Sequence, residues 1–240
     1  MNKLMEKKPI LHAILWILIY VVMVNIGDML SELTEFPYLT GLLLLALSVF
    51  MALYLKESGR VSLYGIKKIT KQDARKTLFY IPMILLAFIQ LFAGIVPALS
   101  ITKVAIACLL MIGTGFVEEL IFRGFLFYGI YGKSGVNKAI IISGITFGIG
   151  HIVNLLRGYT SLEQLEQIVI AIMLGIVLAL LVAITKNIIP GILFHIVFNI
   201  TGTISNAEGN ISTYLMLAIL VISLFYAIYL YRFVQKSNEY

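Results

Sequence analysis

Long apolar stretches alternate with short polar connections along this chain. Eight stretches are apolar enough to cross a bilayer as helices, which takes about 20 residues each. Helices satisfy their own backbone hydrogen bonds in lipid, so the pattern predicts an all-α, polytopic membrane protein. No long polar linker divides the chain, which favours a single transmembrane domain over residues 1–240. The eight predicted spans are roughly 10–30, 38–55, 77–99, 102–131, 139–157, 167–185, 188–205 and 211–233.

The composition supports this prediction. Hydrophobic residues make up 60% of the chain, the mean hydropathy is +1.00, and only 12% of residues are charged, against about 25% in globular proteins. A soluble domain could not bury so much apolar surface. The basic N-terminus resembles the start of a signal peptide, but no small-residue cleavage pattern follows it. We therefore expect an uncleaved first span.

The charged residues are unevenly distributed among the connections. If the N-terminus is cytoplasmic, 15 of the 18 Lys and Arg residues lie on cytoplasmic segments, and the outer segments hold only Lys103 and Arg157. This bias predicts about eight transmembrane helices with both termini cytoplasmic. The net charge of +6 therefore reflects topology and contact with membrane lipid, and we expect no nucleic-acid partner. In a bacterium or archaeon the location would be the plasma membrane. The basic stretch 56–76 fits either an amphipathic surface segment or a solvated loop.

Ionisable residues within predicted spans are costly and usually mark function. His12 lies at the mouth of the first span, where we expect an inexpensive interfacial position. Glu119 and Arg123 are four residues apart on one helix and can pair, whereas Glu118 points about 100° away. The pattern predicts a mainly structural Glu119 and an available Glu118. Glycines at 113, 115 and 124 would let a neighbouring backbone or a substrate approach.

Two later spans carry histidines. Phe147 and His151 lie one helical turn apart, on a segment whose glycines at 144 and 148 form a small-xxx-small packing face. His195 and Asn199 are likewise one turn apart. Counted from the flanking lysines at about 1.5 Å per residue, Glu118, His151, His195 and Asn199 lie roughly 13–23 Å from the cytoplasmic boundary. This narrow band predicts that the polar groups meet in one intramembrane cavity.

These motifs resemble those of a known family. Glu-Glu-x-x-x-Arg at 118–123, Phe-x-x-x-His at 147–151 and His-x-x-x-Asn at 195–199 are together similar to the CPBP family. That family comprises type II CAAX prenyl endopeptidases and bacteriocin-processing enzymes, also called Abi proteins. The resemblance covers residues 113–202 and implies an intramembrane endopeptidase with catalytic core helices over about 102–205.

The resemblance also implies roles for the motif residues. Glu118 would be the general base that activates water, helped by His151, and His195 with Asn199 would hold the developing oxyanion. Glu119 and Arg123 would orient the site. The substrate would be a hydrophobic or lipidated peptide or protein; its identity and the oligomeric state stay open.

Metal dependence is open as well. Members of the family are commonly described as metalloproteases, and Glu118, His151 and His195 could form a three-ligand zinc site with an open position for water. The sequence has no His-Glu-x-x-His motif, and its single cysteine, Cys108, excludes a cysteine-based site. We prefer a mechanism that requires no cofactor, with zinc as the alternative.

Two other classes of function compete with the peptidase. The chain could act without enzymatic activity, in bacteriocin self-immunity or in regulating a membrane partner. It could also be a transporter or proton-coupled channel, since intramembrane Glu and His serve as relays. The absence of repeat symmetry and of paired broken helices in the sequence argues against a transporter.

Overall fold

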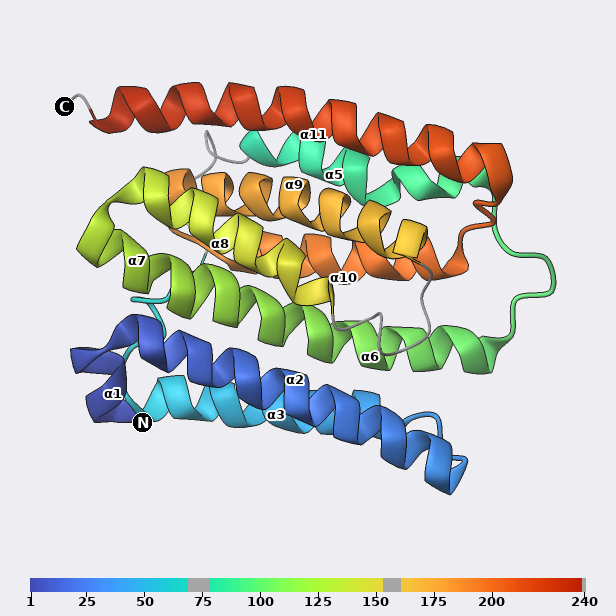
Figure 1. Cartoon of the computed structure of the whole chain (residues 1–240), viewed down its shortest axis with the longest axis horizontal. Coiled ribbons are helices and arrows are strands. Elements are labelled where there is room, and N and C mark those ends of the chain that lie inside the picture. The colour runs from blue at the N-terminus through green and yellow to red at the C-terminus, as the bar shows by residue number, and fades with distance from the viewer. Residues whose placement is uncertain (69–77, 153–160, 239–240) are drawn as a thin grey trace.

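The computed structural model describes residues 1–68, 78–152 and 161–238, and these residues form a bundle of helices (Figure 1). Within these ranges the only extended pairing is an isolated bridge between Ile95 and Ser205. The all-α prediction is therefore confirmed for the part of the chain described. The α-helices are α1 (Asn2–Lys7), α2 (Pro9–Thr34), α3 (Leu39–Glu57), α5 (Ile81–Phe88), α6 (Ile101–Glu119), α7 (Phe127–Ser134), α8 (Val136–Gly150), α9 (Ser161–Thr185), α10 (Ile189–Ile204) and α11 (Gly209–Asn238). Two short 3-10 helices, η2 (Leu78–Tyr80) and η3 (Ile89–Ala93), flank α5, and a π-helical segment, η4 (Leu120–Leu126), joins α6 to α7.

Five helices in the described ranges are long and apolar enough to cross a membrane. They are α2, α3, the continuous α6–η4–α7 segment Ile101–Ser134, α9 and α11. Three shorter apolar helices, Ile81–Ala93, Val136–Gly150 and Ile189–Ile204, correspond to the other predicted spans. The chain is thus a multi-pass integral membrane protein, while the count of eight crossings stays a prediction.

The third predicted span is shorter and less regular than the sequence pattern indicates. We expected a helix over 77–99, but the helical region ends at Ala93. Gly94 follows with φ of 81°, a left-handed conformation that glycine adopts without strain. The chain then runs extended through Ile95, whose bridge partner Ser205 follows the end of α10.

Glycines allow the central helices to approach one another closely. A Cβ atom at Gly148 would lie 2.6 Å from the backbone N of Ile172, and one at Gly144 would lie 2.9 Å from that of Ile176. The predicted small-xxx-small face therefore exists, and it packs against α9. A Cβ at Gly113 would lie 2.7 Å from Leu44 Cβ of α3, so the first motif helix also approaches its neighbour at a glycine.

The two ends of the bundle differ in charge. The helix α1 and the end of α11 lie at the same end, on the left in Figure 1, together with the α3, α7 and α9 C-termini. The connections there carry most of the Lys and Arg residues; we call this the basic end. Asp28, Glu32, Glu35, Glu166 and Glu208 belong to the opposite end, which we call the acidic end.

Residues 58–68 cover part of the basic end. Tyr64 is buried and its ring packs edge-on against Phe125, with the centroids 4.9 Å apart. The backbone N–H of Ile188 donates to the Gly65 carbonyl at 2.9 Å. The first part of the basic stretch therefore packs on the bundle as turns; the rest of the predicted surface segment, residues 69–77, lies outside the described residues.

Candidate active site

The two adjacent glutamates lie at the end of α6, where the helix changes to π geometry. The side chains of Glu119 and Arg123 are fully buried, and Arg123 Nη1 donates to Glu119 Oε1 at 2.8 Å. The predicted pairing of Arg123 with Glu119 is confirmed. A buried charge is stable in an apolar interior only when it is paired and hydrogen-bonded, so this ion pair fixes the orientation of the Glu119 carboxylate.

The π-helical segment η4 is tied to α8 by a serine. A π turn disturbs the regular i→i−4 ladder and is frequent at functional sites. Here the Phe122 carbonyl accepts a hydrogen bond from Ser143 Oγ at 2.8 Å, and Ser143 is completely buried. This contact holds the motif helix against the helix that carries Phe147 and His151.

His195 lies between the two carboxylates. Its Nδ1 is 3.2 Å from Glu119 Oε1, and its Nε2 is 3.4 Å from Glu118 Oε2. The residue is 6% exposed, so the contacts with the carboxylates are shielded from solvent. The sequence assigned the two glutamates separate roles, yet both reach the same imidazole.

Tyr20 holds the other oxygen of Glu118. Its hydroxyl donates to Glu118 Oε1 at 2.6 Å, from α2. A hydrogen bond this short to a carboxylate is a strong one. The sequence analysis did not select Tyr20, because an aromatic residue within an apolar span gives no distinctive signal.

His151 caps the C-terminus of α8 and has one ring nitrogen engaged. Its Nδ1 lies 3.1 Å from the Phe147 carbonyl oxygen, which can only accept, so Nδ1 carries the hydrogen. In neutral His151 the Nε2 atom is then free of a proton and can accept one. Phe147 packs edge-on against His151 and His195, at centroid distances of 5.1 and 5.6 Å, and the Arg123 guanidinium lies 4.2 Å from its centroid.

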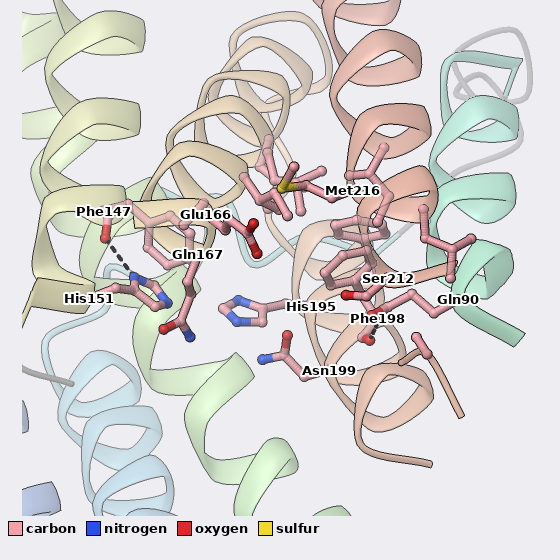
Figure 2. A pocket seen from close by; sticks show the side chains of 18 residues that line it. Gln90, Phe147, His151, Glu166, Gln167, His195, Phe198, Asn199, Ser212 and Met216 are labelled. Carbon is pink, nitrogen blue, oxygen red and sulfur yellow. Dashed lines mark hydrogen bonds between the residues drawn. The ribbon is translucent and has the colours of Figure 1, made fainter. Parts of the chain in front are cut away.

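Two adjoining cavities meet at these residues. The larger, about 450 Å³, is lined by His195 and by apolar side chains of α9, α10 and α11. The smaller, about 250 Å³, contains Glu118 and Tyr20 and extends along α2. Phe147, His151, Gln167 and Asn199 line both cavities. Figure 2 shows His151, His195 and Asn199 around the larger cavity, with His195 and Asn199 on one face of α10. Glu118 lines only the smaller cavity and His195 only the larger one, so the single cavity expected from the sequence is here two adjoining cavities.

The proposed zinc ligands are not assembled as a metal site. Throughout the described ranges, no three His, Cys, Asp or Glu side chains are grouped so that they could hold a metal ion. Both nitrogens of His195 face carboxylates, and Nδ1 of His151 faces a carbonyl. The arrangement therefore does not fit a Glu118, His151, His195 zinc site.

His12, near the start of α2, is buried within the protein. It is 1% exposed; Trp16 Nε1 donates to its Nε2 at 3.0 Å, and Tyr54 Oη lies 3.1 Å from the same atom. Phe125 of η4 also covers it, with its ring centroid 4.7 Å from that of His12. His12 thus belongs to a packed aromatic cluster. Its position at the membrane interface stays a prediction.

A bundle of apolar helices with buried carboxylates and histidines beside two cavities defines a membrane-embedded protein with a cluster of ionisable residues in its interior. Comparison with known families gives the more specific identification. Residues 100–201 match the family described as type II CAAX prenyl endopeptidase Rce1-like. The matched segment contains all three motifs, so the resemblance to the CPBP family is confirmed. No curated protein and no solved structure matches the chain.

Proposed function

We propose that this protein is an intramembrane endopeptidase in which Glu118 activates water for attack on a peptide bond. Family membership supports a membrane-embedded protease. The observation that carries the specific assignment is the contact between Glu118 and His195 at the junction of the two cavities. The topology that goes with this proposal has eight crossings and both termini in the cytoplasm.

Glu118 is suited to the role of general base. Tyr20 fixes one carboxylate oxygen, and the other is directed towards His195. A water beside Glu118 gives its proton to the carboxylate as its oxygen attacks the carbonyl carbon of the substrate. The same proton then passes to the amide nitrogen as the C–N bond breaks, which restores the base and releases an amine and a carboxylic acid.

His195 is suited to hold this proton in transit. Its Nδ1 hydrogen is directed to Glu119, whose charge is fixed by Arg123. This leaves Nε2 facing Glu118 Oε2 at 3.4 Å, so the imidazole can accept the proton from the protonated carboxylate and return it. Glu119 and Arg123 therefore act as positioning residues through His195.

His151 and Asn199 face the space that the scissile bond would occupy. Both line each cavity. The unprotonated Nε2 of His151 can accept a hydrogen bond from the attacking water, and the Asn199 amide can donate to the oxyanion of the tetrahedral intermediate. The apolar lining of the larger cavity fits a hydrophobic or lipidated peptide.

The mechanism proposed for these residues proceeds without a metal ion. The directions of the imidazole nitrogens, which face carboxylates and a carbonyl, support this choice over zinc. Dialysis of the purified protein against a chelator, with metal content and peptidase activity followed together, tests it. We expect activity to persist in metal-free protein; loss on dialysis and recovery with zinc would contradict the proposal.

The Glu118→Gln variant tests the function. Replacing the base while keeping its shape should lower the cleavage rate by a factor of about 10² to 10⁴, measured on a farnesylated CAAX peptide and on its unlipidated counterpart in detergent. Glu208→Gln changes an exposed carboxylate that lines neither cavity and should leave the rate unchanged. Cleavage by Glu118→Gln at the wild-type rate would overturn the assignment.

A further inference from the structure

The bundle is tightly packed between the site and the basic end. Leu120, Ile121, Arg123 and Phe127 are all 0% exposed, and they follow the two glutamates directly along the chain. Tyr64 from the 58–68 segment lies against the same helix, since its Cβ would be 3.7 Å from a Cβ added at Gly124. Among the described residues, the side chains between Glu118 and the basic end are therefore closely packed.

The cavities lead the other way. From Glu118 the smaller cavity follows α2 past Asn25 to Asp28, about 12 Å along the helix from Tyr20. A third cavity of about 310 Å³ shares Asp28 with it and continues to Glu32 and Tyr38 in the α2–α3 connection. The larger cavity extends from His195 to Ser212, near the start of α11. In Figure 1 these segments lie at the acidic end, on the right.

The walls of this entrance are negative. Besides Glu118, three carboxylates line the cavities: Asp28 and Glu32 on the α2 side and Glu166 in the larger cavity. No Lys or Arg is among the described residues that line the three cavities. Glu166 makes no ion pair with another described residue, and Figure 2 shows it on the same side of the cavity as His151 and Gln167. An anionic entrance attracts cationic ligands and repels anionic ones.

We propose that the substrate is a cationic peptide segment that enters from the acidic end, with Glu166 binding a basic side chain or a free amino group beside the scissile bond. This inference rests on the proposed peptidase function. It places the entrance on the non-cytoplasmic face, because the Lys and Arg residues gather at the opposite end of the bundle. The substrate class is then an exported or externally exposed membrane peptide with basic residues next to an apolar segment.

Cysteine accessibility tests this proposal without needing hydrolysis. In the full chain carrying Cys108→Ala, single cysteines are placed at Ser212 and Met216, which lie one turn apart on α11 and both line the larger cavity. A third is placed at Ser134, which is exposed at the basic end. Intact cells and inverted vesicles are treated with two membrane-impermeant thiol reagents, one cationic and one anionic. Rates are normalised to the reaction of a free thiol with each reagent.

We expect Ser212→Cys and Met216→Cys to react in intact cells, and Ser134→Cys to react only in inverted vesicles. The cationic reagent should react faster at both cavity positions. Adding Glu166→Gln should reduce the cationic-to-anionic rate ratio about fivefold, whereas Glu35→Gln, an exposed carboxylate that lines none of the three cavities, should leave it unchanged.

Two results would overturn the proposal. One is labelling of Ser212→Cys only from the side that labels Ser134→Cys. The other is a rate ratio that Glu166→Gln does not change. Because labelling does not depend on catalysis, failure here is separate from failure of the peptidase assignment, which the Glu118→Gln variant tests.

Discussion

Removing Arg123 alone should destabilise the protein strongly. The side chain is completely buried; its guanidinium donates to Glu119 at 2.8 Å and stacks on Phe147 at 4.2 Å. Arg123→Met keeps most of the side-chain volume but leaves the Glu119 carboxylate buried without its cation. Loss of one partner of a buried ion pair costs about 3–5 kcal/mol. For a chain of this size that corresponds to a fall in Tm of roughly 6–20 °C.

The double variant Glu119→Leu/Arg123→Met separates stability from chemistry. With both charges gone, no buried ion is left unpaired, and apolar replacement of a buried pair is often close to neutral. Only His195 Nδ1 loses its acceptor, which costs about 1–3 kcal/mol. The double variant should therefore be more stable than Arg123→Met, yet peptidase activity should stay low in both because His195 is no longer oriented.

Thermal unfolding in detergent, followed by tryptophan fluorescence, measures both effects, and cleavage of the peptide probes measures activity. If Arg123→Met unfolds within 2 °C of the wild type, or if the double variant is less stable than the single one, the ion pair does not have the energetic role assigned to it. A fully active double variant would remove Glu119 and Arg123 from the positioning of His195.

Two further predictions concern contacts outside the charged motif. Tyr20→Phe removes the hydroxyl that donates to Glu118 at 2.6 Å. Because a hydrogen bond to a charged group contributes about 1.5–3 kcal/mol, kcat should fall roughly tenfold or more with KM little changed. An unaltered kcat would refute a role for Tyr20 in orienting the base. Gly148→Ala places a Cβ 2.6 Å from the backbone N of Ile172 and should lower Tm by separating α8 from α9, at a cost of about 1–3 kcal/mol. At Gly132 of α7 the added Cβ would meet no atom within 4 Å beyond the backbone of its own helix. Gly132→Ala should therefore not lower Tm, because alanine is favoured over glycine within a helix; an equal fall in Tm for the two variants would contradict the packing argument.

The pairing of Glu119 with Arg123 and the packing at the glycines could be predicted because both depend on short-range helical periodicity. Glu119 and Arg123 are one turn apart, and that spacing fixes their pairing whatever surrounds the helix. Gly144 and Gly148 also follow helical spacing, and the structure places α9 against them. The meeting of the histidines with Glu118 followed from a depth count along helices, since a membrane protein confines its helices to nearly parallel paths.

Other features depend on contacts between distant segments, which spacing does not reveal. Tyr20 is 98 residues from Glu118, and it reaches the carboxylate only because α2 packs on η4. The π-helical turn after Glu119 likewise has no sequence signal. The Phe122 carbonyl in this turn accepts its hydrogen bond from Ser143, which lies 21 residues further along the chain. The burial of His12 likewise depends on Tyr54 of α3 and Phe125 of η4, which its own helix does not reveal.

The shared imidazole changes how the two glutamates are understood. Helical spacing separates them, because Glu119 pairs with Arg123 and Glu118 points elsewhere. Yet the two ring nitrogens of His195 bring the carboxylates into one chain, from Arg123 through Glu119 and His195 to Glu118. In the proposed mechanism, the positive charge of Arg123 stabilises a negative charge on Glu119, and this favours the His195 tautomer with its hydrogen on Nδ1. The Nε2 atom would then be able to exchange a proton with Glu118. On this proposal, the ion pair of Glu119 with Arg123 determines which proton Glu118 can use.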